Sequence, residues 1–73
     1  MHNEGRKKMT DQEKLQALLP HWIEHNEEHA AEFRRWAELA SPDVAADIEE
    51  AARRMEAANE ALADALRKLR ATR

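Results

Sequence analysis

The sequence has 73 residues and a net charge of −3, from 12 basic and 15 acidic side chains. Of its 31 apolar residues 15 are alanine, so a lone chain of this size supports only a marginal hydrophobic core. The absence of cysteine excludes disulfides and thiolate metal sites. A single glycine and a single serine exclude a glycine-rich phosphate loop and a nucleophile elbow, and we expect a protein that is not an enzyme.

The charge pattern and the hydropathy narrow the choice of partners. Basic residues are scattered among acidic ones, whereas nucleic-acid-binding proteins show a clear basic excess or stripe. No apolar run approaches the roughly 18 residues that a membrane span requires. Residues 1–9 have no hydrophobic stretch of a secretory signal, and we interpret them as a flexible leader before a single domain at residues 10–73. We therefore expect a cytoplasmic protein that binds neither nucleic acid nor membrane.

A first helix is predicted from residue 11 to residue 40. Thr10 and Glu13 have the spacing of a capping box at its start. Pro20 interrupts the helix, but the apolar stripe continues through it in phase, which predicts a kink rather than two separate helices. The stripe follows the 3.6-residue period and consists of Leu15, Leu18, Leu19, Trp22, Asn26, His29, Phe33, Trp36 and Ala40.

A second helix is predicted from residue 42 to residue 71. Ser41 is a good N-cap and Pro42 suits the first helical position. The very short connection predicts an antiparallel two-helix hairpin. The predicted seam of the second helix has the alternating four- and three-residue spacings of a coiled coil and consists of Val44, Ile48, Ala51, Met55, Ala58, Leu62, Ala65 and Leu69. In this assignment the flanking residues Ala45, Ala52 and Leu66 stay uncovered by the hairpin.

A homodimer is expected, because a long two-helix hairpin encloses no core of its own. Two hairpins can pair into an all-α four-helix bundle that covers the flanking apolar residues. Parallel and antiparallel orders of the two chains both satisfy the pattern. The predicted oligomer interface consists of Trp22, Asn26, Phe33, Trp36, Ile48, Ala51, Met55, Ala58, Leu62, Ala65 and Leu69.

Three consecutive His-x-x-Glu units occupy residues 21–32. At about 100° per residue, His21, His25 and His29 fall within a sector of about 80°, and imidazoles at positions i and i+4 can share one metal ion. Glu28 and Glu32 lie on the same side and can add oxygen ligands. The segment therefore predicts a site for a divalent transition metal, nickel or zinc, that serves metal handling or sensing.

The polar residues Asn26 and His29 lie on the predicted apolar stripe, where unpaired polar groups cost free energy. Such conflicts are typical of functional sites, but two other interpretations stay open. A buried asparagine often determines register and oligomeric state, which would make this a structural oligomerisation or protein-interaction module without metal. Protonation of His29 would instead give a dimer that weakens at acidic pH. A dinuclear oxidase is disfavoured, because such sites use the opposite order, Glu-x-x-His.

A family resemblance rests on residues 19–30, LPHWIEHNEEHA, and on residues 32–37, EFRRWA. The segment resembles a small family of uncharacterised helical-hairpin domains from anaerobic bacteria and archaea, which occur alone or beside a CooT-like nickel-binding β domain. The resemblance covers about residues 10–70. It implies a role in binding or handling a transition metal such as nickel, with a metalloprotein or nickel-handling protein as partner. The matching positions are His21, His25 and His29.

Overall fold

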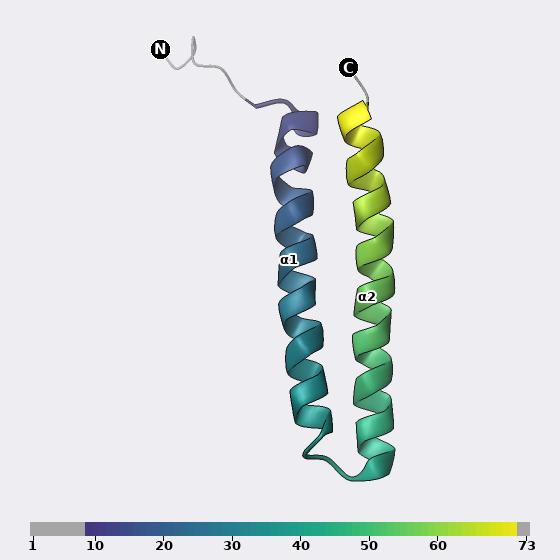
Figure 1. Cartoon of the computed structure of the whole chain (residues 1–73). Coiled ribbons are helices and arrows are strands. Elements are labelled where there is room, and N and C mark those ends of the chain that lie inside the picture. The colour runs from purple at the N-terminus through teal and green to yellow at the C-terminus, as the bar shows by residue number, and fades with distance from the viewer. Residues whose placement is uncertain (1–8, 72–73) are drawn as a thin grey trace, which may run out of the picture.

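The computed structural model describes residues 9–71 and shows two long helices joined by a short turn (Figure 1). Helix α1 covers Asp11–Ala37 and helix α2 covers Pro42–Ala71. The two helices run antiparallel, so the start of α1 lies beside the end of α2. No strand occurs in the described residues. The all-α hairpin is confirmed, whereas its pairing into a four-helix bundle stays a prediction. Apart from Met9, the predicted leader lies outside the described residues.

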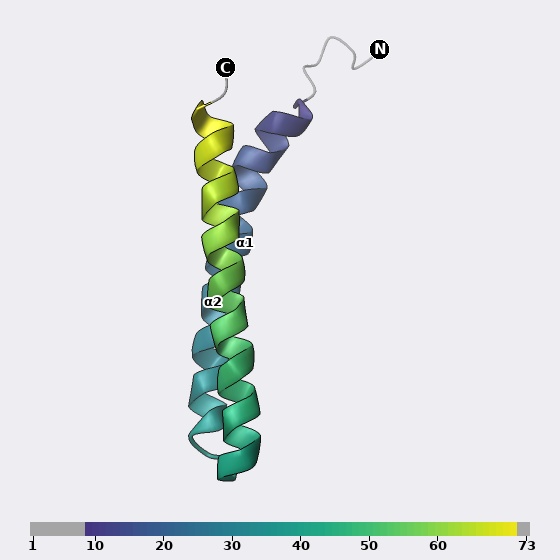
Figure 2. The same cartoon turned by 90° about the vertical axis from the view of Figure 1, so that its right-hand side faces the viewer.

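The start of α1 is closed by the predicted capping box. The Glu13 N–H donates to Thr10 Oγ1 at 3.1 Å, and the Thr10 N–H donates to Glu13 Oε1 at 2.9 Å. These two bonds satisfy backbone donors that the first turn of a helix leaves without a partner. The helix continues through Pro20 without a break, and Figure 2 shows its first turns diverging from α2.

The turn begins earlier than the sequence predicts. Helix α1 ends at Ala37 rather than at residue 40, because the next N–H groups bond to nearer carbonyls: Leu39 donates to Trp36 and Ala40 to Ala37. Beyond the turn, Asp43 Oδ1 accepts hydrogen bonds from Ser41 Oγ at 2.9 Å and from the Val44 N–H at 3.0 Å. These bonds, the one from Ser41 first, lower the pKa of the Asp43 carboxyl and place a negative charge at the positive end of α2.

The residues of α2 that pack against α1 differ from the predicted seam: one of the two heptad columns is shifted by one residue towards the C-terminus. The buried residues are Ala52, Asn59 and Leu66, with Ala45 half-buried in the same heptad column. The predicted column of Ala51, Ala58 and Ala65 is exposed instead. The other predicted column is half-buried beside the seam and consists of Ile48, Met55, Leu62 and Leu69. The prediction was wrong for the alanine column because the observed column contains Leu66, which buries more apolar area, and Asn59, which bonds to α1.

The face of α1 that meets α2 is also rotated from the predicted stripe. Leu19, Ala30 and Ala37 are buried against α2, and Ile23 is half-buried. Trp22 and Trp36 of the predicted stripe are exposed on the single hairpin, and their place in an oligomer interface stays a prediction. His29, which also belongs to the predicted stripe, is half-buried.

The hairpin buries few side chains between its two helices. It measures 12 Å in its thinnest direction, which is about the diameter of one helix with its side chains. Three of the five buried apolar residues are alanines, and none of the large side chains of residues 9–71 is completely buried. A single hairpin therefore has a contact surface between two helices but no closed core.

Candidate functional site

One side of the hairpin, which we call the apolar face, carries the exposed apolar side chains of Leu15, Trp22 and Val44. Three open grooves follow one another along it, and each is lined by both helices. Trp22 is 40% exposed and Trp36 is 59% exposed. The grooves are lined, from the open end of the hairpin to the turn, by Leu15, Leu19, Ala65, Lys68 and Leu69, then by His21, Trp22, His25, Asn26 and Leu62, then by Phe33, Val44, Asp47, Ile48 and Ala51.

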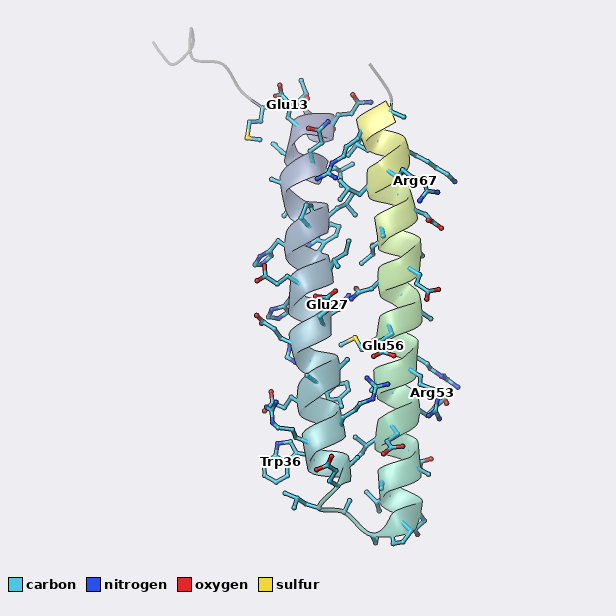
Figure 3. All side chains as sticks on the ribbon, viewed as in Figure 1. Glu13, Glu27, Trp36, Arg53, Glu56 and Arg67 are labelled. Carbon is cyan, nitrogen blue, oxygen red and sulfur yellow. The ribbon has the colours of Figure 1, made fainter. Side chains whose placement is uncertain are left out.

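The opposite side of the hairpin is polar. Figure 3 shows Glu27 and Glu56 on the side that faces the viewer, while Trp36 projects outward from α1 and away from α2. Arg34 forms a two-bond ion pair with Glu56 across the helices, one bond being Nη2 to Oε1 at 3.1 Å. The hydrogen bond from Arg34 lowers the pKa of Glu56, and the same bond raises the pKa of Arg34. This side suits contact with water, so the two sides of the hairpin have different chemistry.

The histidines lie along α1 at the border of the apolar face. The Nε2 atoms of His25 and His29 are 3.1 Å apart, and the two rings meet edge to face with centroids 4.5 Å apart. His21 stacks on His25 at a centroid distance of 6.0 Å. The ring of His29 lies 6.2 Å from that of Phe33. The predicted i, i+4 spacing thus brings the Nε2 atoms of His25 and His29 together, while His21 stacks on the ring of His25.

The spacing of the His25 and His29 nitrogens suits a shared metal ion. When each nitrogen lies about 2.0–2.1 Å from the metal, the two coordinating nitrogen atoms are about 3.3 Å apart on a tetrahedral ion and about 2.9 Å apart at neighbouring positions of a square-planar ion. The observed 3.1 Å lies between these values. It also matches a hydrogen bond in which one neutral imidazole donates to the other. The geometry therefore admits a metal pair and a purely structural pair.

No third metal ligand joins this pair within one hairpin. Among the residues that the structure describes, no three histidine, aspartate or glutamate side chains converge as a metal site would require. The sequence assigned His21, Glu28 and Glu32 to complete the shell, and the hairpin alone does not bring them to the pair. His21 and Glu28 instead line a small pocket with Glu24 and His25.

Asn59 is the residue that the sequence analysis missed. Asn26 Nδ2 donates to Asn59 Oδ1 at 2.9 Å, and Asn59 Nδ2 donates to the backbone carbonyl of Ile23 at 3.0 Å. Asn59 is the polar member of an otherwise apolar heptad column, which is the signal that could have identified it. Because Asn26 has a partner in the hairpin, its position on the stripe no longer points to a ligand. A pH-sensitive dimer based on His29 stays a prediction.

Neither helix, within residues 9–71, combines the length and the apolar character that would let it cross a membrane.

The fold and the site define a class: a two-helix hairpin with one uncovered apolar face and a surface pair of histidines. Residues 15–69 match the domain of unknown function DUF8180, and the chain belongs to this family. An uncharacterised protein of Archaeoglobus fulgidus is 39% identical over 57 residues, which cover 74% of this chain and 92% of that protein. No solved structure matches the chain. The histidine-rich character and the CooT-like neighbours implied by the earlier resemblance stay predictions.

Proposed function

We propose that this protein is a homodimeric helical hairpin that binds a divalent transition metal ion through His25 and His29. The observation that carries the proposal is the 3.1 Å separation of their Nε2 atoms on the same helix that carries the exposed tryptophans. Imidazole ligands suit zinc, nickel and copper. A pair of imidazoles on the surface of a helix suits the handling or sensing of a metal ion.

The dimer is supported by the composition of the apolar face. Exposed apolar side chains that gather along one face, as in the three successive grooves, are typical of an interface. The small core of the hairpin leads to the same proposal, since a chain of this length needs a further source of stability. A second copy provides it by burying the same face on both chains.

A structural oligomerisation module is the second candidate function. The Asn26–Asn59 pair favours it, because a paired polar contact inside a helical seam selects one alignment of the helices. In this alternative His25 and His29 are joined by a hydrogen bond and bind no metal. The protein would then act through its apolar face alone.

Calorimetric titration of the chelator-treated protein with Zn²⁺ and with Ni²⁺ separates the two candidates. Metal binding predicts saturable binding in the unsubstituted protein and an affinity at least about tenfold lower in His25→Ala and in His29→Ala. His21→Ala is the matched control, because it removes an exposed imidazole from the same helix face but leaves the pair intact. Circular dichroism must show unchanged helix content in each variant. Equal affinities in His29→Ala and the unsubstituted protein would refute the assignment, and a dimer that binds neither metal would favour the structural module.

A further inference from the structure

Six side chains of α1, on the apolar face and along its border, are arranged nearly symmetrically about residue 27. His25 and His29 lie two residues on either side of it, and Leu18 and Trp36 lie nine residues on either side. Trp22 and Phe33 lie five and six residues from it. At about 100° per residue, all six fall within a sector of about 80° of the helix. When a helix pairs antiparallel with its own copy, each residue meets the residue at the mirrored distance from the centre. This arrangement sets His25 against His29 and Leu18 against Trp36, and it brings Trp22 and Phe33 to levels that differ by one residue.

Helix α2 carries a second symmetric set of side chains on the same side of the hairpin. Ala51, Ala58 and Ala65 are exposed at heptad spacing, with Ala58 in the middle. Small side chains let two helix backbones approach closely. Asp47 and Lys68 line the apolar face near the two ends of this alanine stripe, so antiparallel pairing brings opposite charges together at both ends.

The two centres lie at the same height in the hairpin. The hydrogen bond between Asn26 and Asn59 sets these residues side by side. Because the helices are antiparallel, one step forward in α1 corresponds to one step back in α2, which places residue 27 level with Ala58. A single two-fold axis perpendicular to both helices therefore passes through both centres. A two-fold axis parallel to the helices would instead place α1 of one chain over α2 of the other. That arrangement does not require residue 27 and Ala58 to lie at the same level, so their common level favours the perpendicular axis.

We infer that two hairpins pair antiparallel about this axis and share one metal site, in which His25 of each chain lies against His29 of its partner. The metal part of this inference rests on the function proposed above. Each hairpin supplies two imidazoles, and no third ligand joins them among its described residues, so the second copy completes the site. Four imidazole nitrogens satisfy a tetrahedral zinc ion or a planar copper or nickel ion. The expected stoichiometry is one ion per two chains.

Cysteine cross-linking tests the symmetry without metal, since the chain has no cysteine of its own. Ala58→Cys lies at the axis and is expected to cross-link to its own copy when a short thiol cross-linker is added to the chelator-treated dimer. Ala51→Cys and Ala65→Cys are each expected not to cross-link alone, because equivalent residues are then about 21 Å apart along the helices. An equal mixture of these two variants is expected to cross-link again. Ala63→Cys, beside Glu60 on the polar side, is the control that must not react.

The outcomes separate this inference from the proposed function. Equal cross-linking of Ala51→Cys, Ala58→Cys and Ala65→Cys, or a monomer in sedimentation, would overturn the antiparallel pairing whatever the metal titration shows. One ion per chain would overturn the shared site while leaving His25 and His29 as ligands. The expected cross-links together with no metal binding would refute the proposed function and confirm the pairing.

Discussion

Substituting the two paired asparagines tests how much the polar contact in the seam contributes to folding. Asn59→Ala removes two hydrogen bonds, one from Asn26 Nδ2 and one to the Ile23 carbonyl. At about 0.5–1.5 kcal/mol net for each bond, the loss is about 1–3 kcal/mol. Alanine regains up to about 0.7 kcal/mol through its higher helix propensity. The expected net destabilisation is therefore about 0.5–2 kcal/mol, which lowers Tm by several degrees in a domain of this size.

A double-mutant cycle isolates the bond between the two side chains. Asn26→Ala, Asn59→Ala and the double variant are compared, so that the propensity of alanine cancels at each position. The expected coupling free energy is about 0.5–1.5 kcal/mol, from one hydrogen bond between two neutral amides. Thermal unfolding followed by far-ultraviolet circular dichroism measures it, at one protein concentration because a dimer's Tm depends on concentration. A coupling below about 0.3 kcal/mol would refute the reasoning, since this is the error expected of independent sites.

Two further predictions concern the two sides of the hairpin. Trp36→Glu places a charge on a side chain that is 59% exposed in the single hairpin, so we expect the hairpin to keep its helix content. We expect the dimer to dissociate at least about tenfold more readily in sedimentation equilibrium, because dimerisation would bury the new charge. An unchanged dissociation constant would mean that Trp36 stays uncovered in the dimer. Because Arg34 lowers the pKa of Glu56 from its ordinary 4.5, the ion pair stabilises the fold above that pH and its contribution is lost as the pH falls through the lowered pKa. Glu56→Gln should therefore show a slightly smaller fall in Tm on acidification than the unsubstituted protein, small because both side chains are exposed, and an identical fall would contradict this role.

Whether a contact could be predicted from the sequence depended on how far apart its two residues lie along the chain. The capping box joins Thr10 to a residue three positions away, and the His25–His29 contact spans one helical turn. Both depend on helix geometry alone, so residue spacing predicted them. The contact between Asn26 and Asn59 joins residues 33 positions apart, and spacing within one helix carries no information about it.

The phase of the seam shows the same limit in detail. Ala51 and Ala52 are identical neighbours, and each belongs to a heptad column in which at least three of four residues are apolar: Val44, Ala51, Ala58 and Ala65 in one, and Ala45, Ala52, Asn59 and Leu66 in the other. Hydrophobicity within α2 therefore does not distinguish the two columns. Packing against α1 does, because one column presents Leu66 to the partner helix and lets Asn59 reach Asn26. Helix α1 turns Leu19, Ala30 and Ala37 towards α2, and this orientation leaves its two tryptophans on the outer surface.

By itself the sequence determined two helices, the cap at Thr10, the reversal at Ser41 and Pro42, and a pair of imidazoles one turn apart, since all of these follow from local backbone geometry and short spacings. Only the tertiary structure decided which alanine column faces inward, which residue satisfies Asn26, and that the histidines border an uncovered apolar face. The physical reason is that burial and hydrogen bonding between helices depend on the surface that each helix meets, and that surface belongs to a distant part of the chain.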